Sequence, residues 1–123
     1  MLQIEEVLND FKKYSRLSDS QLVDVTFRND KGETPLHYAA MFGDHLAIKL
    51  LCDAGVEVDA RDEMGSTPLW HAVFNVQMTA VSALIASGAN PELRNNIGES
   101  PWAMVEACEN LQWMRPLLKP RSR

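Results

Sequence analysis

Cysteine and long apolar runs are both scarce in this chain, and their scarcity excludes several classes of protein. Only two of the 123 residues are cysteine, Cys52 and Cys108, too few for a disulfide scaffold, so we expect two free thiols. No run approaches the roughly 18 apolar residues of a membrane-spanning helix. The first residues also lack the basic and then apolar order of a secretory signal. We therefore expect a cytoplasmic protein without a membrane segment.

Motifs for catalysis or cofactor binding are missing as well. The sequence has no phosphate-binding glycine loop, no Cys-x-x-Cys pair and no acidic calcium loop. His37, His45 and His71 have no carboxylate or cysteine at a spacing that would bring a nucleophile and a base together on one helix face. His37 and His71 could line adjacent helices, but two histidines without a third ligand make a poor zinc site. We expect no metal and no cofactor, and an enzyme is only a remote alternative.

Basic residues are outnumbered by acidic ones. The chain has 12 lysines and arginines against 17 acids, a net charge of −5. Without Lys119, Arg121 and Arg123 of the basic tail, nine basic residues remain and the net charge is −8. Binding a duplex depends on basic side chains that displace counterions from phosphates, so we expect no direct nucleic-acid binding. An acidic body suits a basic protein partner, although the same charge can simply keep a small protein soluble.

The sequence does have a tripeptide that returns at a fixed distance. Thr34-Pro35-Leu36 recurs as Thr67-Pro68-Leu69 and, altered, as Ser100-Pro101-Trp102, each copy 33 residues after the last. A step of this length carried by Thr-Pro-Leu-His-x-Ala is the signature of ankyrin repeats, and residues 34–39 match it at every specified position. The chain therefore resembles the ankyrin-repeat family over nearly its whole length. Three glycines keep the same step: Gly32, Gly65 and Gly98.

Each motif residue also has a local role. A hydroxyl residue followed by proline begins a helix, because the hydroxyl caps free N–H groups and proline has none to lose. Gly43 is expected to end the first helix and Asp44 to cap a second, so one repeat is a turn, two antiparallel helices and a loop. Val76 stands where Gly43 stands one repeat earlier. We expect Asn75 to take the left-handed conformation there and to displace the loop of residues 74–77.

The expected fold is an all-α ankyrin-repeat solenoid of stacked helix-turn-helix units with β-hairpin or turn loops. We expect one domain over 1–118, with an N-terminal cap at 1–28, repeats at 29–61 and 62–94, a degenerate C-terminal cap at 95–118 and a basic tail at 119–123. A cap is favoured for the first helix over a partner-binding or membrane-surface role, because its polar face is not basic. Its apolar face is predicted from helical spacing: Leu2, Ile4, Val7, Leu8, Phe11 and Tyr14.

The C-terminal unit departs most from the family pattern. Pro116 must shorten or kink its second helix, because proline lacks an N–H and crowds the preceding turn. Trp102 and Trp113 are expected to cover the end of the stack rather than to bind a ligand. The resemblance gives His37 the role of the motif histidine, whose hydrogen bonds tie neighbouring repeats together.

The resemblance also indicates where a partner binds. Ankyrin repeats usually contact partners through a concave face, made of the hairpin tips and the exposed side of each first helix. Large apolar groups at such positions, ringed by acids, suit a protein interface; alternatively, Phe42 or Phe74 folds back onto the helix pair as core. The implied protein-binding residues are Asp30, Lys31, Glu33, Met41, Phe42, Glu63, Met64, Ser66, Phe74, Asn75, Asn96, Ile97 and Glu99.

A non-enzymatic protein-protein interaction module is thus the function that the resemblance implies. Small single-domain ankyrin proteins include immunity proteins that neutralise secreted bacterial toxins, and an acidic surface would suit a basic toxin such as a nuclease. The alternative is a small adaptor, or a regulatory inhibitor of an endogenous enzyme, without any toxin. We expect a monomer, although exposed methionine and phenylalanine side chains could drive self-association at high concentration.

Overall fold

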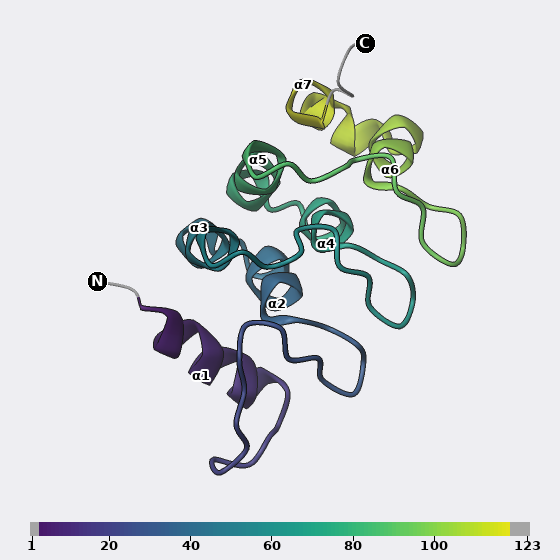
Figure 1. Cartoon of the computed structure of the whole chain (residues 1–123). Coiled ribbons are helices and arrows are strands. Elements are labelled where there is room, and N and C mark those ends of the chain that lie inside the picture. Colours follow the sequence, from purple (N-terminus) through teal and green to yellow (C-terminus); the bar gives the residue numbers. More distant parts are fainter. Residues whose placement is uncertain (1–2, 119–123) are drawn as a thin grey trace.

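A computed structural model describes residues 3–118, and within this range the chain forms helices and turns but no β-strand. Helix pairs stack side by side along one direction, and the loops between pairs all project to one side (Figure 1). Leu2 of the expected cap helix and the expected basic tail at 119–123 lie outside the described residues. The helices are α1 (Ile4–Tyr14), α2 (Pro35–Met41), α3 (His45–Asp53), α4 (Pro68–Phe74), α5 (Met78–Ala86), α6 (Pro101–Ala107), the 3-10 helix η1 (Glu109–Met114) and α7 (Arg115–Leu118).

The repeated motif begins each inner helix, as the sequence predicts. The hydroxyl oxygens of Thr34, Thr67 and Ser100 each accept a hydrogen bond from the backbone N–H three residues later, at the starts of α2, α4 and α6. Proline follows each of them at the first helical position. A cap of this kind contributes about 1 kcal/mol to stability. Asp44 caps α3 in the same way, by accepting from the N–H of Ala47.

The loops before the inner helices are tight turns that bond to one another. In the first, the Oδ1 atom of Asn29 accepts from the N–H groups of Lys31 and Glu33, and Gly32 takes a φ of 73°. Asp62 and Asn95 close the next two loops in the same way. These loops are too short to form a ladder of paired strands. Of the two expected forms, β-hairpins and turns, residues 3–118 contain turns only.

An arginine one position before each of these closing residues adds a second set of contacts between loops. The guanidinium of Arg28 donates to the carbonyl of Arg61 at 2.6 Å, and that of Arg61 donates to the carbonyl of Arg94 at 2.7 Å. Backbone bonds run in parallel, from Glu63 N–H to the carbonyl of Lys31 and from Asn96 N–H to that of Met64. Successive loops are therefore held in one register.

The core lies between the inner helices α2, α4 and α6 and the outer helices α3, α5 and α7 (Figure 1). Residues at the 33-residue step fill equivalent places, as Ile48, Val81 and Met114 show, all of which are fully buried. Burying a side chain of this size contributes about 1.5–3 kcal/mol. At the N-terminal end α1 packs on α2 and α3 and buries Val7 and Phe11.

The C-terminal unit is irregular, as expected from Pro116. Its second helix is broken into η1 and the short α7, which contains Pro116. The expectation that Trp113 covers the end of the stack is wrong, because half of this residue is exposed and the neighbouring Met114 and Leu118 are buried in its place. Trp102 is half-buried, and the guanidinium carbon of Arg115 lies 6.0 Å from its ring centre.

The turn between α4 and α5 corrects a second expectation. Asn75 has a φ of −92°, and it is Val76 that adopts the left-handed conformation, with a φ of 57°. The loop is not displaced, because its hydrogen bonds from Val76 N–H to Val73 and from Gln77 N–H to Ala72 repeat those around Gly43 one repeat earlier. The shared bonding pattern fixes the backbone, and a β-branched residue is forced into a conformation that suits glycine.

We predict that Val76→Gly stabilises the protein by about 1 kcal/mol. A side chain in the left-handed region costs about 1–2 kcal/mol, and the greater freedom of glycine in the unfolded chain offsets part of that gain. Urea denaturation measures the difference. The opposite change, Gly43→Ala, should destabilise, since Gly43 has a φ of 72° and an added Cβ would collide with the Gln77 side chain. A lower unfolding free energy for Val76→Gly than for the native chain would contradict the assignment of strain.

Candidate binding surface

Most of the large apolar residues that the sequence places on the binding surface do face solvent. Phe42 and Phe74 are each 60% exposed, Met64 is 52% exposed and Ile97 is 67% exposed. Met41 is less exposed than these four residues, because its side chain is half-buried. The alternative in which Phe42 or Phe74 becomes core is therefore wrong, although the Phe42 ring contacts Tyr38 of α2 and the Phe74 ring contacts Trp70 of α4.

The exposed apolar residues form two groups at opposite ends of the inner helices. Met64 and Ile97 stand at equivalent positions on the loops that precede α4 and α6. Phe74 is the last residue of α4, and Phe42 directly follows α2. A helix of seven residues rises about 10 Å, so the inner helices separate the loop group from the phenylalanine group. A partner that touched both would span the length of these helices.

Two of the predicted binding residues are buried and do not face solvent. Glu33 is 5% exposed, and its carboxylate accepts hydrogen bonds from the Tyr14 hydroxyl and the Asn29 amide. Ser66 is 3% exposed, and its hydroxyl oxygen accepts from the Asn95 side chain in the next loop. Glu33 joins its own loop to α1, and Ser66 joins its loop to the next one, roles that their tip position in the sequence does not reveal. The remaining predicted positions are exposed: Asp30, Lys31, Glu63, Asn75, Asn96 and Glu99.

His37 connects the first helix pair to the second. The backbone N–H of Thr34 donates to its Nδ1 atom at 3.1 Å, so Nδ1 carries no proton and the Nε2–H donates to the carbonyl of Ser66 at 3.0 Å. Burial lowers the pKa of His37 to about 4, because the charged ring would lose its water. The neutral ring is therefore the form that joins the two pairs.

In the structure the carboxylate of Asp62 lies beside the two histidines, and the spacing of residues in the sequence did not predict it. Polar atoms of His37, Asp62 and His71 lie within 4.8 Å of one another, and His71 Nε2 is 2.8 Å from Asp62 Oδ2. Asp62 lies on the loop before α4, so helix periodicity could not have placed it near the rings. Both nitrogens of His37 are already used in the bonds to Thr34 and Ser66. A metal ion on His37 would break the bond that links two repeats.

The family of the chain follows from this repeated geometry and from a family model. The model for ankyrin repeats, in three copies, matches residues 7–95. The chain belongs to the ankyrin-repeat family. No curated protein matches the sequence. Ankyrin repeats indicate a protein-protein interaction module, and the His37 bond to Ser66 confirms the role that the resemblance gives to the ankyrin motif histidine.

The second ankyrin motif lacks this histidine. Trp70 stands 33 residues after His37, and its Nε1 is the only buried side-chain nitrogen or oxygen without a hydrogen-bond partner in residues 3–118. Its ring stacks on Phe74 instead, with ring centres 4.9 Å apart and planes 9° from parallel. An unpaired buried N–H costs about 1–3 kcal/mol. The stack between Trp70 and Phe74 is thus an aromatic feature that the repeat consensus does not require.

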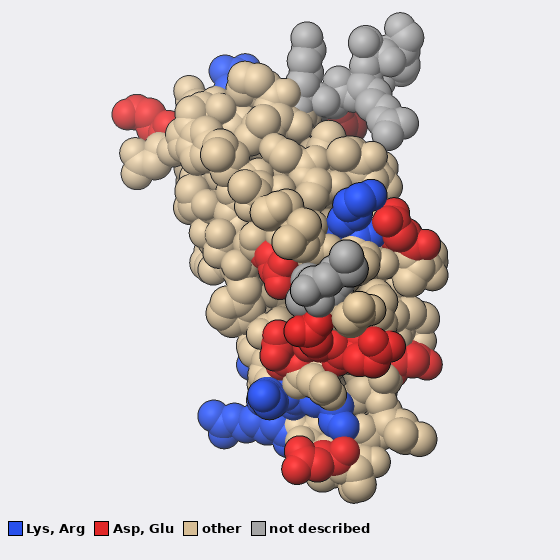
Figure 2. Space-filling model, turned by 90° about the vertical axis from the view of Figure 1, so that its left-hand side faces the viewer, with Lys and Arg blue, Asp and Glu red and all other residues tan. Residues whose placement is uncertain are grey.

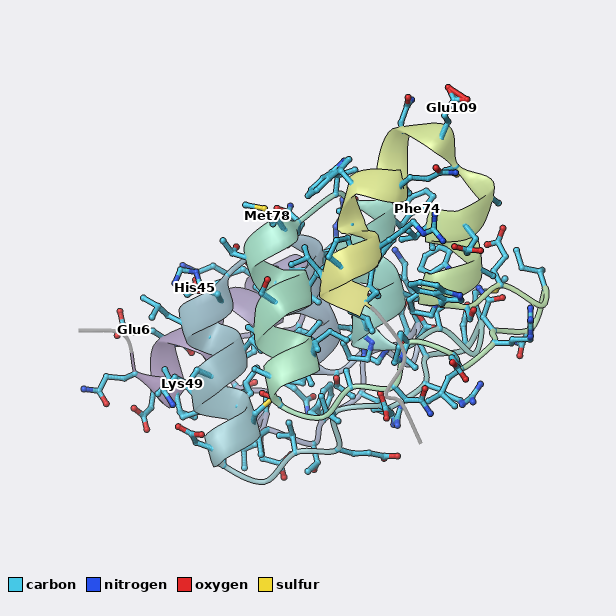
Figure 3. All side chains as sticks on the ribbon, turned by 90° about the horizontal axis from the view of Figure 1, so that it is seen from above. Glu6, His45, Lys49, Phe74, Met78 and Glu109 are labelled. Carbon is cyan, nitrogen blue, oxygen red and sulfur yellow. The ribbon has the colours of Figure 1, made fainter. Side chains whose placement is uncertain are left out.

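Charge is unevenly spread over the outer face of the ankyrin stack. Figure 2 shows Lys, Arg, Asp and Glu gathered over α1 and α3 in the lower half, with few above them. Helix α5 contains no charged residue, and seen from above it lies beside α3, which carries His45 and Lys49 (Figure 3).

A membrane-spanning helix is not found among residues 3–118, where every helix is too short or too polar for that role.

We predict that the ankyrin stack loses stability as the pH falls from 7 to 5, because of His37. The unfolded chain takes up a proton near pH 6.5, whereas folded His37 resists protonation until about pH 4. Since the unfolded state binds more protons in this window, the free energy of unfolding should fall by about 2 kcal/mol between pH 7 and 5.

Urea denaturation at the two pH values, compared with His37→Gln, tests this expectation. The variant should be less stable at pH 7, because glutamine cannot reproduce both ring contacts, but its stability should change less with pH. Equal pH slopes for both proteins would show that His37 is not the responsible group.

Proposed function

We propose that the protein is a monomeric ankyrin-repeat module that binds one partner protein through the loop tips and inner helices and masks part of that partner's surface. The observation that carries this proposal is the exposure of Phe42, Met64, Phe74 and Ile97, each more than half accessible at positions that the ankyrin scaffold leaves free. Apolar and aromatic anchors supply most of the binding energy of a protein interface.

Acidic side chains favour a basic partner. Asp30, Glu63 and Glu99 are exposed on the loops beside Met64 and Ile97, and the whole chain carries a net charge of −5. Charges at the rim of an interface select the partner and speed its approach, whereas the apolar centre holds it. A cationic protein surface is the complement of this pattern.

The most specific form of the proposal is an immunity protein that acts in the cytoplasm and neutralises a bacterial toxin. A nuclease binds phosphates through basic side chains, and an acidic surface that covers these side chains would block its substrate. The net charge of −5 and the exposed carboxylates of Asp30, Glu63 and Glu99 are what support this form of the proposal over masking of a neutral partner. The same loops also carry arginine side chains, but those of Arg28 and Arg61 are bound to carbonyls of the neighbouring loop.

We predict that Phe42→Asp and Phe74→Asp each weaken partner binding at least tenfold, because burying an unpaired carboxylate in an apolar contact is costly. Affinity capture from the host that carries the gene supplies the partner, and calorimetry with that purified partner gives its affinity and stoichiometry, expected to be one to one. Leu22→Asp is the matched control, since Leu22 is 88% exposed in the loop after α1 and outside the proposed surface.

Unchanged affinity in both phenylalanine variants, with circular dichroism showing an intact fold, would remove the proposed surface. The partner's own activity then separates the biological roles. Loss of toxicity in the complex supports an immunity protein, whereas a partner that stays active and is bound together with a second protein indicates an adaptor and contradicts masking.

A further inference from the structure

Besides the buried Phe11, three aromatic rings meet at the contact between α1 and α2. The ring centres of Tyr14 and Tyr38 are 5.1 Å apart, those of Tyr38 and Phe42 are 5.0 Å apart, and those of Tyr14 and Phe42 are 6.0 Å apart. Their planes cross at 47°, 50° and 77°. The rings therefore pack together at steep angles, and we call Tyr14, Tyr38 and Phe42 the aromatic triad.

The triad is partly open to solvent. Phe42 is 60% exposed, and the two tyrosines are half-buried. Tyr38 and Phe42 are four residues apart, so both project from one side of α2. Tyr14 comes from α1, the helix expected only to cap the stack, and its hydroxyl is anchored by Glu33. The capping helix thus contributes to the surface that contains Phe42.

Carboxylates lie around the triad. Burial raises the pKa of the Tyr38 hydroxyl, and the negative charges of Asp10 and Asp44 raise it further. Burial and then the charge of Glu33 raise the pKa of Tyr14 to about 12. Asp10 lies one turn before Tyr14 on α1, and Asp44, the N-cap of α3, follows Phe42 by two residues. Acidic residues on α1, on the loop before α2 and at the start of α3 therefore contribute negative charge at the triad.

This combination selects for a cation. The face of an aromatic ring is electron-rich and attracts an ammonium or guanidinium group, and nearby carboxylates strengthen the attraction. An anion would be repelled by the same carboxylates, and an apolar group would gain nothing from them. The other aromatic pair, Trp70 and Phe74, is stacked nearly parallel and lies beside His71, so its surroundings are different.

We propose that the aromatic triad, with Asp10 and Asp44, is a binding site for one basic side chain, arginine or lysine, presented by the partner protein. The proposal rests on the proposed function, because it names the chemical group that the partner inserts at the Phe42 end of the binding surface. Because the ring centres lie only 5.0 to 6.0 Å apart, the cation binds on the exposed faces of the rings, where the negative charges of the two aspartates that act on Tyr38 favour it.

The site can be tested with a small probe that carries only the proposed group. Nα-acetyl-arginine methylamide is titrated into the ¹³C-labelled protein, and the aromatic resonances are followed by NMR. The neutral isostere Nα-acetyl-citrulline methylamide has the same shape without the charge. We expect the arginine probe, but not the citrulline probe, to shift the resonances of the triad.

Three variants remove single components of the site. Phe42→Leu removes one ring but stays apolar, and Asp10→Asn removes one charge. Asp44→Asn removes the other charge while asparagine still caps α3. Each should weaken arginine binding about twofold to fivefold. Trp113→Leu is the matched control, because Trp113 is an exposed aromatic residue at the far end of the stack, and it should bind the probe like the native protein.

Two results would overturn the site: equal affinity of Phe42→Leu and the native protein for the arginine probe, or equal binding of the arginine and citrulline probes. Either result leaves the proposed function standing if Phe74→Asp still weakens the partner complex. Conversely, a partner complex that survives Phe42→Asp and Phe74→Asp removes the proposed surface, whatever the arginine probe shows.

Discussion

Hydrogen bonds between successive loops hold the inner helices at a constant offset. The guanidinium groups of Arg28 and Arg61 each reach the carbonyl of the next arginine in the series, and the neutral ring of His37 joins the start of α2 to the loop before α4. Each inner helix begins at a cap residue fixed to such a loop, so the loop register determines where every helix starts. The apolar core then fills a spacing that the polar contacts have already set.

The same regularity explains where individual features of the protein are found. Side chains that serve the stack, such as Glu33 and Ser66, are drawn into buried networks even though they stand at loop tips. Side chains that the stack does not need, such as Phe42 and Phe74, remain exposed. The first helix serves both purposes, since Val7 and Phe11 cover the core and Tyr14 contributes a ring to the surface. Residues that build the scaffold and residues that stay exposed are thus separated residue by residue rather than by segment.

Much of this could be predicted from the sequence, because the fold is encoded in a period. The caps at Thr34, Thr67 and Ser100 are confirmed for this reason, and the shortened helix at Pro116 is confirmed because proline lacks an N–H. The repeat period did not predict the contact between Asp62 and His71. This contact joins a loop to a helix, so it depends on the three-dimensional arrangement rather than on spacing along the chain. The period also misplaced the strain at Val76, since the bonding pattern of the turn outweighed the lower preference of valine for the left-handed region. The boundaries of the caps and repeats, and the binding role of the exposed residues, stay predictions.

The arginine contacts also have a consequence for the length of the molecule. Each of Arg28 and Arg61 needs only a carbonyl 33 residues further along, and neither contact depends on how many units precede or follow it. A second copy of residues 62–94 inserted after Arg94 would give Arg94 the same partner that Arg61 now has. The stack is therefore modular in the sense used by engineers: it can be lengthened by whole units while both ends keep their present neighbours.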